Sequence, residues 1–394
     1  MADGHEQFTA RLVDSIAAID AADWDRCAGS RNPFVSHAFL DALEESGSVG
    51  DRTGWWPQHL VLEDGDRGIV GCMPLYLKNN SQGEYVFDHA WAHALEQAGG
   101  RYYPKLQSAV PFSPVPGPRL LTGAVPDPLT RHALISAAIQ FAGRMGVSSL
   151  HVTFADEADW RALAEAGFLP RLGQQFHWPN RGYADFDAFL GALNSRKRKA
   201  IRKERRAVAE AGIALETFHG NEMTAALWDA FHQFYIDTYD RKWGAPYLTR
   251  RFFDLIGERL AERVVLFFAF RHGMPIAAAL NLRGSDALYG RNWGCAEDHP
   301  FLHFECCYYQ AIDYAITHGL ARVEAGTQGP HKVQRGYMPV PTYSAHWIEN
   351  QSFAAAVADF LRREREAVRG EIDWIAAEHS PYRQDDGCSA PPRR

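Results

Sequence analysis

The sequence predicts a mixed α/β fold made of two lobes, with helices interleaved between strands. Three observations support this prediction. The chain has 394 residues, more than one hydrophobic core usually serves. Its composition is 46% hydrophobic and 23% charged, which is typical of a folded globular protein. The pattern of a strand hairpin occurs twice, near residues 59–77 and 264–282, and a strand, helix, strand succession follows each time.

The first lobe is expected to cover residues 1–185. Residues 85–120 are dense in aromatic residues and proline, so we expect an ordered loop region there that either covers the sheet or lines a pocket. Hydrophobic periodicity predicts the remaining elements. They are a strand at 8–13, a helix through Phe39 and Leu43, a hairpin at 59–62 and 68–77, a helix at 129–145, a strand at 149–154, a helix at 157–166 and a strand at 175–178.

The second lobe is expected to cover residues 186–379, beginning with a basic helix, and a flexible polar tail follows at 380–394. Its order of elements repeats that of the first lobe, which suggests a duplicated fold. After the basic helix the predicted elements are helices at 224–238 and 249–261, strands at 264–270, 276–282 and 287–293, a helix at 304–318, a strand at 321–326 and a helical run at 352–378.

Composition narrows the classes of partner. The net charge of -7 and the pI near 6.2 argue against a protein that coats DNA or an anionic membrane, so contact with a polyanion must be local. No apolar run approaches the ~20 residues of a membrane helix, and the first residues lack the pattern of a secretory signal. We therefore expect a cytoplasmic protein without membrane insertion. The six cysteines are sparse and irregularly spaced, which indicates free thiols.

A cluster of cations marks the basic helix. Eight of the eleven residues from Arg196 to Arg206 are lysine or arginine, and they surround most of a helix. Such a run is compatible with a solvated surface helix. It is also compatible with a local site for a phosphate-rich donor, either coenzyme A or the acceptor stem of an RNA, with Arg198 and Arg202 as donor-binding candidates.

A second cluster follows the strand predicted at 321–326. Acid, base, cations and a phenol gather just past the strand end, where α/β sheets usually place ligands. Glycines allow backbone N–H groups to approach a substrate, and cations can neutralise phosphate or carboxylate. A structural turn is the alternative. The candidates from this segment are Glu324, Gly329, His331, Lys332, Arg335 and Tyr337.

The segment 295–307 superficially resembles a metal site, because it contains three cysteines and two histidines. Pro300 prevents one helix from aligning His299 with His303, and the Cys-x-x-Cys pairs of structural zinc sites are absent, so we expect no metal. The segment is better explained as the loop that opens the helix at 304, whose amino terminus can receive an anion beside His303 and Glu305.

The absence of several motifs argues against several enzyme classes. The chain contains no Gly-x-x-x-x-Gly-Lys-Ser/Thr, Gly-x-Gly-x-x-Gly, His-Glu-x-x-His or Gly-x-Ser-x-Gly. P-loop kinases, dinucleotide oxidoreductases and serine hydrolases are therefore disfavoured.

Several segments resemble a known bacterial family. Residues 189–212 resemble the Phe-Leu-x-x-Leu-x-Ser-Lys-x-Arg-x-x-Ile-Arg helix of FemAB-like acyltransferases, and 319–332 resemble their closing segment. The chain as a whole is similar to a FemAB-related family of N-acyltransferases in the GNAT superfamily, linked with peptidoglycan biosynthesis or recognition. The segments that carry this similarity are 83–88, 102–106, 111–120, 175–178, 302–305 and 335–337.

The resemblance implies a tandem GNAT-like fold and the transfer of an acyl or aminoacyl group to a small-molecule or peptide amine. The donor would be acyl-coenzyme A or aminoacyl-tRNA, and the pyrophosphate signature of ordinary acetyltransferases is not found after Trp293. An attacking amine must be neutral, so a general base is expected, with Glu324 and His331 as candidates. Backbone N–H groups near Arg291 and Asn292 would stabilise the oxyanion, and Tyr337 would protonate the leaving group.

A second class of function remains open at this point. The same fold could serve as a binding module without catalysis, recognising a peptidoglycan-type peptide or precursor.

Overall fold

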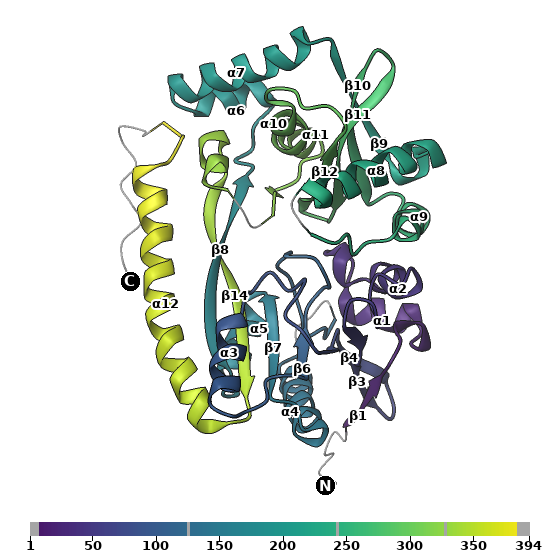
Figure 1. The fold of residues 1–394 in the computed structure, drawn as a ribbon, viewed down its shortest axis with the longest axis vertical. Coiled ribbons are helices and arrows are strands. Elements are labelled where there is room, and N and C mark those ends of the chain that lie inside the picture. Colours follow the sequence, from purple (N-terminus) through teal and green to yellow (C-terminus); the bar gives the residue numbers. More distant parts are fainter. Residues whose placement is uncertain (1–7, 124–126, 242–243, 327–328, 384–394) are drawn as a thin grey trace.

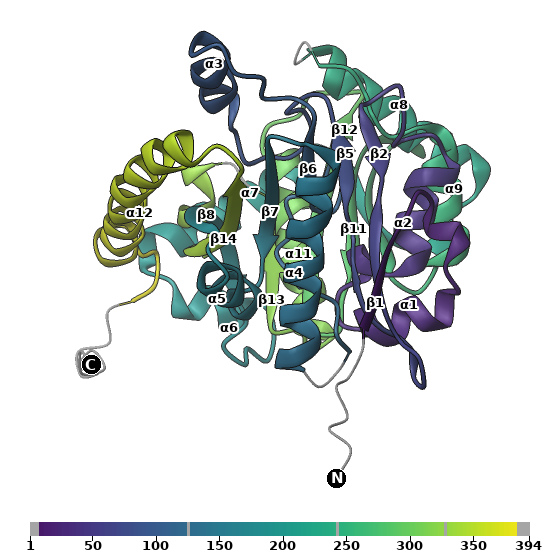
Figure 2. The same cartoon turned by 90° about the horizontal axis from the view of Figure 1, so that it is seen from below.

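The computed structural model describes residues 8–123, 127–241, 244–326 and 329–383. Within these residues a mixed sheet of eleven strands runs through the whole molecule in the order β2-β5-β6-β7-β14-β8-β13-β12-β11-β10-β9. A second sheet has three strands in the order β1-β3-β4. Helices lie on both sides of the large sheet, as the two views show (Figures 1 and 2). The predicted mixed α/β fold is confirmed.

The first half of the chain forms the lower part of Figure 1. Its elements follow the predicted order closely, and the aromatic region also contains a helix and a short strand. They are β1 (Phe8–Val13), α1 (Ala21–Ala28), α2 (His37–Glu45), β2 (Trp55–Pro57), β3 (His59–Asp64), β4 (Gly68–Met73), β5 (Tyr76–Lys78), α3 (His89–Gln97), β6 (Lys105–Ser108), α4 (Pro128–Met145), β7 (Ser149–Ala155), α5 (Glu157–Glu165) and β8 (Leu169–Pro179).

The second half forms the upper part of Figure 1, and its last strand and helix return along the first half. Its elements are α6 (Phe186–Ala192), α7 (Ser195–Glu210), β9 (Ile213–His219), α8 (Ala225–Arg241), α9 (Arg250–Arg259), β10 (Val264–Arg271), β11 (Met274–Arg283), β12 (Ala287–Cys295), α10 (Leu302–Phe304), α11 (Gln310–Thr317), β13 (Arg322–Glu324), β14 (Met338–Ile348) and α12 (Gln351–Glu378).

Side chains at the helix ends explain where several helices begin. Asn194 precedes the basic helix α7, and its side-chain oxygen accepts a hydrogen bond from the backbone N–H of Lys197 at 3.0 Å. Asn350 caps α12 in the same way. Such caps satisfy N–H groups that the helix itself leaves free. For α7 the cap fixes the start of a helix that its dense positive charge would otherwise disfavour.

The predicted hairpins are confirmed in both halves. In the first half, β3 runs antiparallel to β4, and β2 runs antiparallel to β5. Between these two pairs the backbone N–H of Gln58 donates to the carbonyl of Leu75. This long hairpin therefore bends from the three-stranded sheet into the large sheet. In the second half, β10 and β11 form a hairpin wholly within the large sheet.

The two halves exchange strands at the centre of the sheet. The late strand β14 lies between β7 and β8 of the first half, antiparallel to both. In turn β8 pairs with β13 of the second half, antiparallel to it. A single sheet therefore joins both halves, and we keep the division into lobes near residue 185 as a proposal based on the repeated order of elements.

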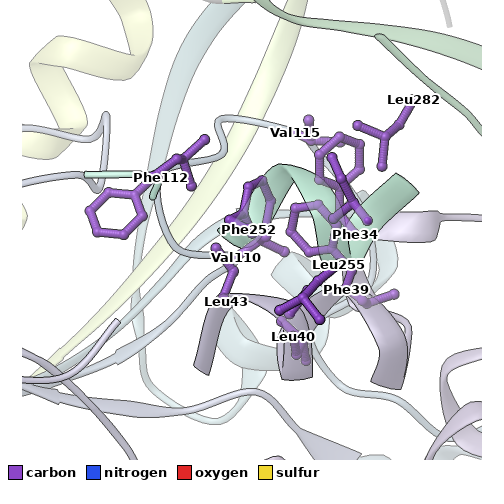
Figure 3. Close-up of a cluster of buried hydrophobic side chains, with 14 of the residues drawn as sticks. Phe34, Phe39, Leu40, Leu43, Val110, Phe112, Val115, Phe252, Leu255 and Leu282 are labelled. Atoms are coloured by element: carbon purple, nitrogen blue, oxygen red, sulfur yellow. The ribbon is translucent and has the colours of Figure 1, made fainter. Parts of the chain in front are cut away.

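A shared hydrophobic core also joins the halves, beside the sheet. Helices α2 and α9 pack on each other, and the ring of Phe39 meets the ring of Phe252 edge to face at 5.7 Å. Figure 3 shows this cluster, which also includes residues of the loop after β6 and of β11. Burying so many aromatic rings stabilises one relative placement of the halves. The cluster borders the site described below.

Five of the six cysteines lie in the described residues, and none of the five forms a disulfide. Cys388 lies outside the described residues, as does most of the predicted tail. Among the described helices, none is both long and apolar enough to cross a membrane.

Candidate active site

The main feature of the second half is a gap between two parallel strands. β12 and β13 pair only from Ala287 to Tyr289 and from Arg322 to Glu324, and the chains then diverge. A cavity of about 100 Å³ lies where they separate. Residues of β11, β12, the start of the following helix and the end of β13 line it: Ala279, Leu280, Asn281, Gly290, Arg291, Asn292, Trp293, His303, Cys307, Tyr308 and Ala325.

A β-bulge shapes one wall of the cavity. Leu280 pairs with Asn292 whereas Asn281 pairs with Gly290, so Arg291 is the extra residue of β12. The extra residue of a bulge is left out of the ladder, and its backbone groups become available. The side chain of Arg291 points to the first half, where it donates to the backbone carbonyl of Phe112. Arg291 and Asn292 therefore both line the cavity, and Arg291 also ties the two halves together.

The opposite wall comes from the helical segment after β12. This segment begins at Leu302, two residues earlier than expected, and contains a π-helical turn from Glu305 to Tyr309. Such turns are frequent at functional sites. His303 lines the cavity, and its ring meets the rings of Trp293 and Tyr308 edge to face, each at 5.4 Å. The π-turn places Cys307 and Tyr308 in the cavity wall as well.

Glu324 stands at the point where the strands part. Its side chain is almost fully buried, and Oε1 accepts a hydrogen bond from Nε of Arg322 at 2.8 Å. Oε2 has no hydrogen-bond partner among the described residues. Burial raises the pKa of Glu324 from its ordinary value of 4.5 to about 7, although Arg322 acts in the opposite direction. A carboxylate with this pKa can accept and release a proton near neutral pH.

An ion-pair chain connects Glu324 with the first half. Arg322 also donates from Nη1 to Oδ2 of Asp286 at 2.7 Å, and the same carboxylate oxygen accepts from Arg31 at 2.6 Å. The chain therefore runs from Glu324 through Arg322 and Asp286 to Arg31. These ion pairs fix the orientation of Arg322 and thereby of the carboxylate.

Two residues of β8 belong to the site although sequence reasoning did not select them. His177 is directly opposite Glu324 in the β8–β13 register, with Nε2 3.8 Å from Oε2 of Glu324. Gln175 lies two residues earlier on the same face, and its Oε1 is 3.1 Å from Nε2 of His177. The alternation of 175–178 indicates that both share one face. The pairing of β8 with a strand almost 150 residues later has no signal in the sequence.

The corresponding gap in the first half is closed. β6 and β7 are also parallel and joined by a helix, and β6 ends at Ser108. The returning chain then pairs Gly117 with Ala155, and the fully buried Arg119 donates to the carbonyl of Thr153 at 3.1 Å and to that of Val115 at 2.8 Å. The backbone bridge and the guanidinium hydrogen bonds therefore close this end of β7, unlike the open end of β12.

The residues after β13 brace the cavity wall. Nζ of the buried Lys332 donates to the carbonyls of Ala325 at 2.6 Å and Gly326 at 2.9 Å, and burial lowers the pKa of Lys332 to about 8. Gly329 has a φ of 114°, and a Cβ there would collide with the ring of His331. The structure therefore explains Lys332 and Gly329 by local geometry rather than by a ligand.

His331 and Tyr337 both contact Tyr308. His331 is exposed, and its Nε2 is 2.9 Å from the hydroxyl of Tyr308, which lines the cavity. Burial, with Arg335 and Lys332, lowers the pKa of His331. Tyr337 is fully buried behind Tyr308, burial raises its pKa, and its hydroxyl has no hydrogen-bond partner among the described residues. Tyr308 therefore reaches the cavity where Tyr337 does not.

The remaining candidates connect the basic helix α7 to the cavity wall. Glu305 is buried and accepts from Arg205 at 3.2 Å. Arg335 is also buried and donates to both carboxylate oxygens of Glu204 at 2.9 and 3.0 Å. The first pair attaches α7 to the helical wall and the second attaches it to the segment after β13, so Glu305 and Arg335 face the interior rather than the cavity.

The outer face of α7 keeps much of its positive charge. Arg202 forms an exposed pair with Asp187 at 2.8 Å, whereas no ion pair joins Arg198 to another described residue. Neither residue lines the cavity, which α7 approaches from outside through the helical wall. Within the described part of the chain, no group of three histidine, cysteine or acidic residues could hold a metal ion.

The fold is mixed α/β, as the sequence led us to expect, and it presents an open gap between β12 and β13. Residues 15–384 match the model of the FemAB-like family, described as peptidoglycan biosynthesis/recognition. The chain belongs to this family. A search of curated proteins found no match.

Solved structures show the same fold at low sequence identity. FemX is 12% identical, with a TM-score of 0.57 over 86% of this chain and 98% of its own. L-PGS from Bacillus licheniformis is 10% identical, with a TM-score of 0.51 over 84% of this chain and 98% of its own. At these identities the comparison establishes the fold and not the chemistry.

Proposed function

We propose that this protein is an N-acyltransferase that moves an acyl or aminoacyl group from acyl-coenzyme A or aminoacyl-tRNA to an amine. The observation that carries the proposal is the open gap between β12 and β13, with a β-bulge on one wall and the buried Glu324 at its end. Its closed counterpart in the first half supports the assignment of the chemistry to the second half.

The proposed reaction uses the two sides of the gap differently. The carbonyl of the donor lies in the cavity, and the backbone N–H at the Arg291 bulge stabilises the oxyanion that forms on attack. The amine reaches the carbonyl from the side of Glu324, whose Oε2 accepts its proton. A C–N bond forms as the C–S bond of a thioester or the C–O bond of an ester breaks.

The leaving group must gain a proton as it departs. The hydroxyl of Tyr308 lines the cavity and is hydrogen bonded to the exposed His331, which can replace the proton from solvent. This assigns His331 to the leaving-group side and Glu324 to the amine side. The buried Tyr337 supports Tyr308 by ring contact at 5.4 Å.

The donor's phosphates are proposed to lie along α7. Its accessible side carries the exposed Arg202 and the half-buried Arg198, and its inner face is fixed to the cavity wall by ion pairs. A helix of this length can contact either the diphosphate of coenzyme A or several phosphates of an RNA. The family description favours a peptide amine of a peptidoglycan precursor as the acceptor.

The test is a transfer assay with purified wild type and Glu324→Gln. Acyl-coenzyme A esters of graded length and aminoacyl-tRNA are supplied with peptide amines, and amide products are detected by mass spectrometry. We expect Glu324→Gln to lower kcat by about 10²–10⁴ with little change in KM. Glu371→Gln on the exposed face of α12 is the matched control.

The outcomes separate the alternatives. Wild-type rates in Glu324→Gln would remove this residue from the mechanism. A rate that falls steeply with salt would identify an RNA donor, because many phosphate contacts would be screened. Tight binding of a donor or peptide without any product would instead assign the chain to the binding modules.

A further inference from the structure

A row of polar side chains on neighbouring strands consists of Gln175, His177 and Glu324. The end of this row at Gln175 contacts a loop of the first half. Nε2 of the buried Gln175 lies 2.6 Å from the backbone carbonyl of Pro114, in the proline-rich loop after β6. Oε1 of Gln175 lies 3.1 Å from Nε2 of His177, which faces Glu324. The row therefore joins a loop of the first half to the base proposed for the second.

Hydrogen-bond chemistry fixes the proton positions along this row. The carbonyl of Pro114 can only accept, so the amide nitrogen of Gln175 must face it. The oxygen of Gln175 is then left toward His177, and an amide oxygen also only accepts. Consequently Nε2 of His177 carries the hydrogen, and the ring is the Nε2–H tautomer.

The same nitrogen lies beside the unpartnered oxygen of Glu324. Oε1 of Glu324 is satisfied by Arg322 at 2.8 Å, whereas Oε2 has no hydrogen-bond partner among the described residues and lies 3.8 Å from Nε2 of His177. At this distance the N–H, which is hydrogen bonded to Gln175, acts on the carboxylate as a nearby positive dipole. A donor that faces Oε2 favours the ionised form of Glu324 and disfavours the protonated form.

We propose that His177 is a positioning residue for Glu324: its Nε2–H, held in place by Gln175 and the Pro114 carbonyl, stabilises and orients the carboxylate that accepts the amine proton. The proposal rests on the function proposed above. It also gives the proline-rich loop of the first half a role, because that loop determines which nitrogen of His177 is protonated.

Other charged and titratable groups surround Glu324 and act alongside His177. Arg322 comes from its own strand, Tyr289 from β12 and Asp286 from the turn before β12, with Arg31 of the first half behind Asp286. Burial lowers the pKa of His177 to about 3, and the nearby cations Arg322 and Lys332 act in the same direction. His177 thus stays neutral across the working pH range, as a tautomer with a single N–H requires.

The experiment compares the pH dependence of kcat/KM in the wild type, His177→Leu, His177→Gln and Gln175→Leu. His177→Leu removes the donor, so the pKa of Glu324 should rise and the acid limb of the profile should move up by about one pH unit. At pH 7 this is about a fivefold loss of rate. His177→Gln keeps an N–H donor and should return the limb to near the wild-type position. His318→Gln, an exposed histidine on the end of α11, is the control.

A second readout does not depend on activity. ¹⁵N NMR of histidine-labelled protein reports the tautomer of His177, identified by its absence in His177→Gln. We expect the Nε2–H tautomer in the wild type and a mixture with the Nδ1–H tautomer in Gln175→Leu. The difference in the free energy of unfolding between the wild type and Glu324→Gln changes with pH, and the midpoint of this change reports the pKa of Glu324. When both proteins also carry His177→Leu, we expect this midpoint to move to higher pH.

The results distinguish this proposal from the proposed function. Transfer activity with an acid limb that does not move in His177→Leu would overturn the positioning role and leave the transferase intact. An Nδ1–H tautomer of His177 in the wild type would overturn it as well. If no donor supports transfer, the proposed function fails. The coupling of His177 to Glu324 is then tested by unfolding alone, and it is refuted if His177→Leu leaves the pH midpoint of the stability difference unchanged.

Discussion

Replacing Glu324 by glutamine should make the folded protein increasingly more stable than the wild type as the pH rises. Burial raises the pKa of Glu324 from 4.5 to about 7, so the folded state holds a proton there that the unfolded state has already released. Ionising the buried carboxyl therefore costs stability as pH rises between these values. At ~1.4 kcal/mol per pH unit, the stability difference between the two proteins should grow by about 2.5 kcal/mol from pH 5 to pH 8.

Urea unfolding at pH 5, 6, 7 and 8 measures this difference directly, with Glu371→Gln as an exposed control that should track the wild type. The constant effects of the substitution, such as the altered hydrogen bond to Arg322, cancel in the comparison across pH. A difference that stays flat would show that Glu324 is ionised throughout, and the assignment of a base with a pKa near neutrality would then be wrong.

Two further predictions concern the closed gap and the basic helix. Arg119→Met should lower the free energy of unfolding by about 3–5 kcal/mol, because it leaves several buried carbonyls without a donor; a loss below 1 kcal/mol in urea unfolding would refute its role in closing the first gap. Reversing the charges of Arg198 and Lys199 to glutamate should raise the KM for the donor, most strongly at low salt, while the same reversal of Arg362 and Arg363 on α12 should not. Equal KM values in the two double variants would remove α7 from donor binding.

Much of the fold could be predicted because local sequence patterns indicate most of its helices and strands. The strands at 264–271 and 274–283 are buried apolar runs on either side of a turn with His272 and Gly273 at positive φ. The helix at 128–145 starts with an Asp127 cap followed by proline. The exchange of β14 and β8 across the centre of the sheet was not predictable, because strand partners far apart in sequence leave no local pattern.

The candidate site was predicted in part for the same reason. The loop after β13 attracted attention through its charges, yet Lys332 and Arg335 direct those charges to backbone carbonyls and to Glu204. Glu324 was selected by its place at a strand end, and the structure adds the burial that changes its pKa. His177 could not be selected from spacing, because its role depends on the pairing of β8 with β13.

The most direct test of the proposed donor site is the thermal stability of the wild type and Ala325→Leu with each donor class. Ala325 lines the cavity, and a leucine there would fill much of its volume of about 100 Å³. A donor at a hundredfold its Kd adds about 2.7 kcal/mol to the native state. We predict that acyl-coenzyme A or aminoacyl-tRNA raises the Tm of the wild type and of the exposed control Ala377→Leu, but not that of Ala325→Leu. Equal stabilisation of all three proteins would place the donor elsewhere and contradict the assignment of the gap between β12 and β13.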